Sequence, residues 1–102
     1  MAAETIDMRD DVTDKYGNLV YLTDERWDHI IEGHGILNGH RAEILSTVRS
    51  GKRRRSPYHP EIFFYKKTFR HLKGRLQKIE VVVAFHWQGD KSNNFIVTAY
   101  PA

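Results

Sequence analysis

The fold is decided by one stretch of the chain, Asn94-Phe95-Ile96-Val97-Thr98-Ala99-Tyr100-Pro101. Alternate side chains of a β-strand point to opposite faces, so the apolar residues 95, 97 and 99 are expected on one face. The even-numbered residues, which include Thr98 and Tyr100, are expected on the other face. A hydroxyl and a phenol would therefore stand side by side on the face that is not core.

Further strands are expected before this one. Residues 79–87 contain the apolar run 81–85 and are typical of a central strand. The aromatic-rich segment 61–68 and the short segment 19–22 have the same character. The links 69–78 and 88–93 contain glycine and are expected to be hairpin connections.

Two helices are expected in the first half of the chain. Thr23 is a suitable N-cap for a helix that ends near Gly33, and acidic residues follow it in the first turn. Asn38 is expected to cap a second helix over residues 39–49, which Gly51 ends. Helices followed by an antiparallel meander predict an α+β fold: two N-terminal helices packed on one face of a four-stranded antiparallel sheet. Residues 1–11 are expected to form a tail, and residues 12–102 a single domain.

Composition narrows the class of protein. The 102 residues include no cysteine, so disulfides and thiolate zinc sites are excluded and a reducing cytoplasm is expected. No apolar run reaches about 18 residues, and the acidic N-terminus does not resemble a signal peptide, so no membrane association is expected. The net charge of +3 permits a polyanionic partner.

Basic residues are concentrated where RNA could be held. Five basic residues lie within seven positions: Arg49, Lys52, Arg53, Arg54 and Arg55. The functional interpretation is that they contact the phosphates of a nucleic acid. A solvated turn is the alternative. Lys66 or Lys67 would stand over the face of Thr98 and Tyr100, but alternation allows only one of the two to point there.

The histidines are candidates for acid–base chemistry, because imidazole titrates near neutral pH. His29 and His34 are five residues apart, which does not match the i, i+4 spacing of a helical metal site, so no metal and no cofactor are expected. His40 and His86 are further candidates for contact with nucleic acid. The alternative is that these side chains only satisfy local hydrogen bonds.

Several segments together resemble a known class of small nucleases. The segments are Tyr21-Leu22-Thr23, Arg26-Trp27-Asp28-His29-Ile30, Gly33-His34, Phe63-Phe64-Tyr65-Lys66-Lys67, Val81-Val82-Val83 and Ile96-Val97-Thr98-Ala99-Tyr100. Over residues 19–101 the chain resembles phage- and toxin-associated nucleases of the barnase–EndoU–colicin–RelE (BECR) class. The ending Thr98-Ala99-Tyr100-Pro101 is similar to the tail of EndoU enzymes.

The resemblance implies a metal-independent endoribonuclease, and a toxin partnered by an antitoxin or immunity protein. It implies that His29 or His34 acts as acid and base, and that Lys66 or Lys67 is the electrostatic group. Thr98 would position the phosphate or base, and Tyr100 would orient the nucleotide. The five-residue spacing of the histidines departs from EndoU enzymes, so His40 or His86 remains open as the second member of the pair.

Other functions remain open. A non-catalytic RNA- or protein-binding module of the same fold would bind RNA without cleaving it. A phage structural or host-takeover interaction protein would show no salt-dependent RNA affinity. An antitoxin or immunity protein is disfavoured by the basic charge, because such proteins are usually acidic where they cover a nuclease cleft.

Overall fold

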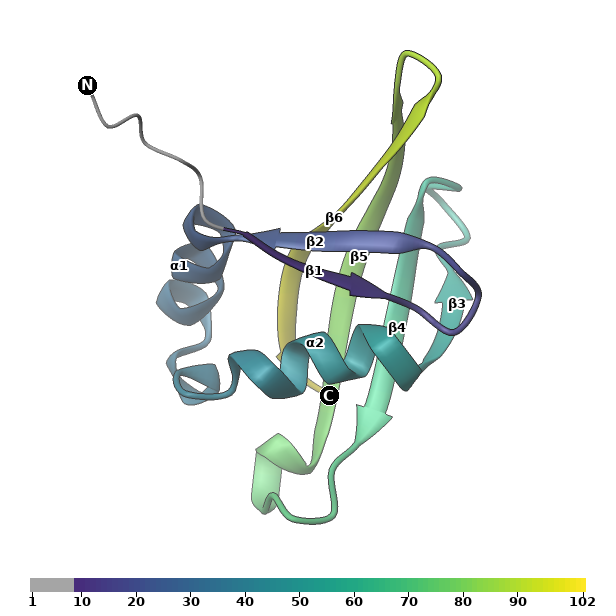
Figure 1. Cartoon of the computed structure of the whole chain (residues 1–102). Helices are drawn as coiled ribbons and strands as arrows, with labels where there is room; N and C mark the ends of the chain where they lie inside the picture. The colour runs from purple at the N-terminus through teal and green to yellow at the C-terminus, as the bar shows by residue number, and fades with distance from the viewer. Residues whose placement is uncertain (1–8) are drawn as a thin grey trace, which may run out of the picture.

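A computed structural model describes residues 9–102 as one mixed sheet and two α-helices (Figure 1). The strands are β1 (Arg9–Thr13), β2 (Leu19–Thr23), β3 (Lys52–Arg55), β4 (Ile62–Thr68), β5 (Lys78–Gln88) and β6 (Lys91–Pro101). The helices are α1 (Asp24–Gly33) and α2 (Arg41–Ser50), and the short 3₁₀ helices are η1 (Gly35–Leu37) and η2 (Gly74–Gln77). No helix within residues 9–102 has the length and apolar character needed to cross a bilayer.

The prediction of a four-stranded antiparallel sheet is wrong, although the fold is α+β. The sheet has six strands in the order β1-β2-β6-β5-β4-β3, and β2 runs parallel to β6. The helices are not N-terminal to the sheet, because two strands precede them. The additional strands arise from pairing: β1 forms a hairpin with β2, and β3 pairs with β4. Of the expected tail, residues 1–8 lie outside the described part, and residues 9–11 belong to β1.

One face of the sheet carries the core. Helix α2 crosses β4 and β5 on this side (Figure 1). Ile79, Val81 and Val83 of β5 are fully buried there, together with Ile44 and Val48 of α2. Alternating apolar side chains on β5 and a helical stripe on α2 therefore bury each other, as their sequence periods predict.

Helix α1 has a different position, along the edge of β6. The parallel pairing of β2 with β6 covers only residues Val20–Tyr21 and Asn94–Phe95, and α1 packs against β6 (Figure 1). The predicted cap is confirmed: the Thr23 hydroxyl accepts a hydrogen bond from the Arg26 N–H at 3.1 Å. The predicted Asn38 cap of α2 is wrong, since His40 precedes that helix and Asn38 ends η1.

A β-bulge in β6 changes which side chains face the core. Val82 pairs with Thr98 and Val83 pairs with Ile96, so Val97 is an extra residue. Simple alternation placed Phe95 with the core and Ile96 with Thr98. The bulge reverses this: Ile96 is 1% exposed in the core, and Phe95 lies on the opposite face.

Candidate functional site

The face of the sheet opposite α2, here called the open face, carries a row of polar side chains. Across four neighbouring strands the register pairs Tyr100 with Glu80, Glu80 with Lys66, and Lys66 with Lys52. Directly paired residues share a face and have Cβ atoms about 5 Å apart. The row therefore crosses β6, β5, β4 and β3 nearly at right angles to the strands.

Glu80 is the centre of this row. Its side chain is 7% exposed. The Tyr100 hydroxyl donates a hydrogen bond to Glu80 Oε1 at 3.0 Å, and Arg54 Nη2 donates to Glu80 Oε2 at 3.1 Å. Burial of the phenol and its hydrogen bond to the Glu80 carboxylate raise the pKa of Tyr100 above its ordinary value. Tyr100 therefore stays protonated at neutral pH and acts as a hydrogen-bond donor.

His34 reaches the row from outside the sheet. It follows the last residue of α1, and its N–H donates to the Ile30 carbonyl at 2.8 Å. The centre of its imidazole ring lies 6.2 Å from the centre of the Tyr100 ring, with the planes tilted by 50°. Because α1 lies along the edge of β6, the His34 imidazole, from the first half of the chain, lies next to the Tyr100 phenol, close to the C-terminus.

A hollow of about 250 Å³ opens beside Glu80. The residues that line it are Lys52, Arg53, Arg54, Phe64, Lys66 and Glu80. The Arg54 guanidinium lies 4.4 Å from the centre of the Phe64 ring, which fixes it over the sheet. The hollow thus combines positive charge, one carboxylate and one aromatic surface.

Thr98 shares the open face with these groups. It lies two residues before Tyr100 and pairs with Val82 on β5. The candidate site therefore consists of His34, Thr98, Tyr100, Glu80, Arg54 and Lys66.

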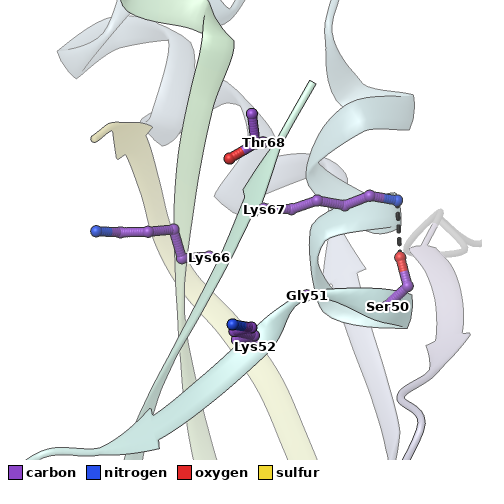
Figure 2. A pocket seen from close by; sticks show the side chains of 6 residues that line it. All are labelled: Ser50, Gly51, Lys52, Lys66, Lys67 and Thr68. Carbon is purple, nitrogen blue, oxygen red and sulfur yellow. Dashed lines mark hydrogen bonds between the residues drawn. The ribbon is translucent and has the colours of Figure 1, made fainter. Parts of the chain in front are cut away.

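The two neighbouring lysines point to opposite sides of β4, as Figure 2 shows. Lys66 lies on the open face. Lys67 reaches α2, where its ammonium group donates to the hydroxyls of Ser46 and Ser50, each at 2.7 Å. Lys66 is thus the lysine that joins the row.

Three of the predicted histidines lie elsewhere. His29 is exposed on α1. His40 lies at the start of α2, with Nδ1 3.4 Å from Glu43. His86 is on the open face, where it stacks on Phe95 at 5.6 Å, but it belongs to the β5–β6 hairpin beyond the polar row. The structure therefore brings His34 to Tyr100 and leaves these three apart from it.

The basic stretch is split between the two faces. Lys52 and Arg54 lie on the open face, while Arg53 points to the core side, where its guanidinium is 4.4 Å from the Phe63 ring. Arg55 also lies over the Phe63 ring. Arg49 is exposed on α2. The sequence did not predict a strand here, and the alternation of strand β3 is what separates these side chains.

Sequence reasoning missed Glu80 as a member of the site. The available signal was a carboxylate directly before the apolar run 81–85, on the face predicted for Thr98 and Tyr100. Charged residues are seldom buried without a partner. An acidic residue next to a central strand's apolar run therefore indicates a cation and a donor nearby.

No family model, curated protein or solved structure matches this chain. Among residues 9–102, no three histidine, aspartate or glutamate side chains are grouped to hold a metal ion.

Proposed function

We propose that the protein is a metal-independent endoribonuclease. The observation that carries the proposal is the convergence of an imidazole, a buried carboxylate, a phenol and two cations along one row on the open face. Acid–base groups next to fixed positive charge are what phosphodiester cleavage without a metal requires. The resemblance to BECR nucleases supports the same activity.

In the proposed reaction the substrate supplies its own nucleophile. The Glu80 carboxylate takes the proton from the 2′-hydroxyl, and the 2′-oxygen forms a bond to phosphorus. His34, in its protonated form, gives a proton to the 5′-oxygen as the bond from phosphorus to that oxygen breaks. The products are a 2′,3′-cyclic phosphate and a 5′-hydroxyl end, so protons and bonds balance.

The remaining residues stabilise the charge that develops on the phosphoryl oxygens. Arg54 and Lys66 supply positive charge, and the Thr98 hydroxyl is a donor that orients the phosphate. Tyr100 donates its one proton to Glu80 and orients the nucleotide with its ring. Glu80 also holds Arg54 and Tyr100 in place through its two hydrogen bonds. DNA has no 2′-hydroxyl and is expected to resist cleavage.

The proposal extends to biological context. A basic open face is suited to an acidic antitoxin or immunity protein, as the resemblance to toxin nucleases implies. The cysteine-free composition is consistent with action in the cytoplasm.

The test is incubation of the purified protein with end-labelled RNA in EDTA, with DNA of the same sequence in parallel. We expect RNA cleavage with cyclic-phosphate ends and intact DNA. His34→Ala should reduce the rate by about 10²–10⁴-fold. His59→Ala is the matched control, because His59 is exposed in the loop before β4. RNA binding without cleavage would show that the protein is a binding module and not an enzyme. Cleavage that does not depend on His34 would contradict the assignment of His34 to the reaction site.

A further inference from the structure

A second basic hollow lies next to the candidate site, at the corner where β3 begins and β4 ends (Figure 2). Its volume is about 290 Å³, and it is lined by Ser50, Gly51, Lys52, Lys66, Lys67 and Thr68. Lys52 and Lys66 also line the hollow beside Glu80, so the two spaces adjoin. This corner hollow has no role in the proton transfers described above.

The charges around the corner hollow are unbalanced. Lys52 and Lys66 are directly opposite each other in the β3–β4 register. Like charges at directly paired positions destabilise a sheet. Within the described residues, 9–102, neither ammonium group forms an ion pair with a carboxylate, because Glu80 is engaged by Arg54 and Tyr100.

The corner is built by a close approach of the backbone. A Cβ at Gly51 would lie 2.4 Å from the Thr47 carbonyl oxygen and 2.7 Å from the Lys66 carbonyl oxygen. Glycine therefore lets the end of α2 meet β4 directly. Lys67 points to the α2 side of β4, where its ammonium group donates to Ser46 and Ser50, so the charge of the corner hollow comes from Lys52 and Lys66.

We propose that the corner hollow is a phosphate subsite, which holds a non-scissile phosphate of the RNA chain. This inference rests on the proposed function for the identity of the chain that supplies the phosphate. Lys52 is the principal contact, Lys66 is shared with the reaction site, and Thr68 also lines the hollow.

Distance along the row sets the substrate class. Neighbouring strands are about 4.8 Å apart, so Lys66 and Lys52 lie about 10 and 14 Å from Tyr100 across the sheet. The long side chain of Lys66 can cover the shorter separation, but the longer one, to Lys52, exceeds the reach of one phosphate group. The site is therefore suited to an oligonucleotide with at least one phosphate beyond the scissile bond, rather than to a dinucleotide.

The test uses Lys52→Ala, which removes one ammonium group from the corner hollow and gives Lys66 no new ion-pair partner. Cleavage of a dinucleotide and of a pentanucleotide is compared at several salt concentrations. We expect kcat/KM for the pentanucleotide to fall by about tenfold and its salt dependence to weaken by about one unit of log–log slope. The dinucleotide should be cleaved at the wild-type rate. Lys91→Ala removes the same charge at the far tip of the β5–β6 hairpin and should alter neither substrate (Figure 1).

A second measurement separates this subsite from the proposed activity. Inorganic phosphate is titrated into the protein while the amide NMR signals of Gly51 and Thr68 are followed. We expect saturable shifts that Lys52→Ala abolishes and His34→Ala preserves. Such shifts without any RNA cleavage would uphold the subsite and overturn the nuclease. RNA cleavage without these shifts, or an equal loss on both substrates, would overturn the subsite and leave the nuclease standing.

Discussion

Replacement of Glu80 by glutamine perturbs the centre of the row with little change of shape. In the wild-type protein the Glu80 carboxylate accepts hydrogen bonds from Tyr100 at 3.0 Å and from Arg54 at 3.1 Å. Glutamine keeps one acceptor oxygen, and its NH₂ group faces the other donor. Because residue 80 is only 6% exposed, the donor that faces this NH₂ group loses its hydrogen bond without gaining one to water. The free energy of unfolding should therefore fall by about 1–3 kcal/mol. For a domain of this size the midpoint Tm falls by roughly 5–15 °C.

Glu80→Gln should also slow RNA cleavage, and by more than the loss of stability accounts for. Loss of a general base lowers kcat by about 10²–10⁴-fold. The assay is single-turnover RNA cleavage at neutral pH, at a temperature below the Tm of both proteins. Glu80→Gln and His34→Ala should each lower the rate by this factor.

Glu32→Gln on the exposed side of α1 is the matched control and should leave the rate unchanged. If Glu80→Gln shows the expected fall in Tm and yet keeps the wild-type kcat, Glu80 only holds Tyr100 and Arg54. The assignment of the base would then be wrong.

Three further predictions concern the scaffold. Tyr65→Phe removes a 2.6 Å hydrogen bond from a fully buried phenol to Asp14 and should destabilise the fold by about 2 kcal/mol in urea unfolding. Burial opposes ionisation of Asp14, but the bonds from Tyr65 and from nearby backbone N–H groups outweigh it and hold the pKa of Asp14 below 3.8. This stabilisation is therefore complete above pH 3.8 and is lost as pH falls through the lower folded-state pKa, and the loss should be absent in Asp14→Asn. Gly51→Ala forces α2 away from β4 and should lower stability by about 1–3 kcal/mol, measured by thermal unfolding.

Controls for these variants use exposed positions. Tyr58 is 84% exposed, so Tyr58→Phe should leave the free energy of unfolding unchanged. Gly33→Ala has open space around the added Cβ and should be tolerated. A Gly51→Ala variant as stable as Gly33→Ala would contradict the close approach of α2 to β4.

Local signals predicted several elements well. Thr23 caps α1, and its helical stripe ends at Gly33. The apolar run 81–85 lies within β5. These elements depend on residues near one another in the chain, so periodicity and capping chemistry are sufficient to find them. Strand β3 was missed because four consecutive basic residues lack the apolar alternation of a strand. Its pairing with β4 is a tertiary contact.

The sequence by itself determined that this is an α+β chain with an apolar central strand, and that Thr98 and Tyr100 share a face. It also limited the site to a few histidines and lysines, because local periods fix the side of an element on which each residue lies. Only the tertiary structure decided that His34 and Lys66 join Tyr100, that Glu80 lies between them, and that Ile96 rather than Phe95 enters the core. Those outcomes depend on strand register, on the bulge at Val97 and on the position of α1 against β6. Such relations link distant segments, so no local pattern encodes them.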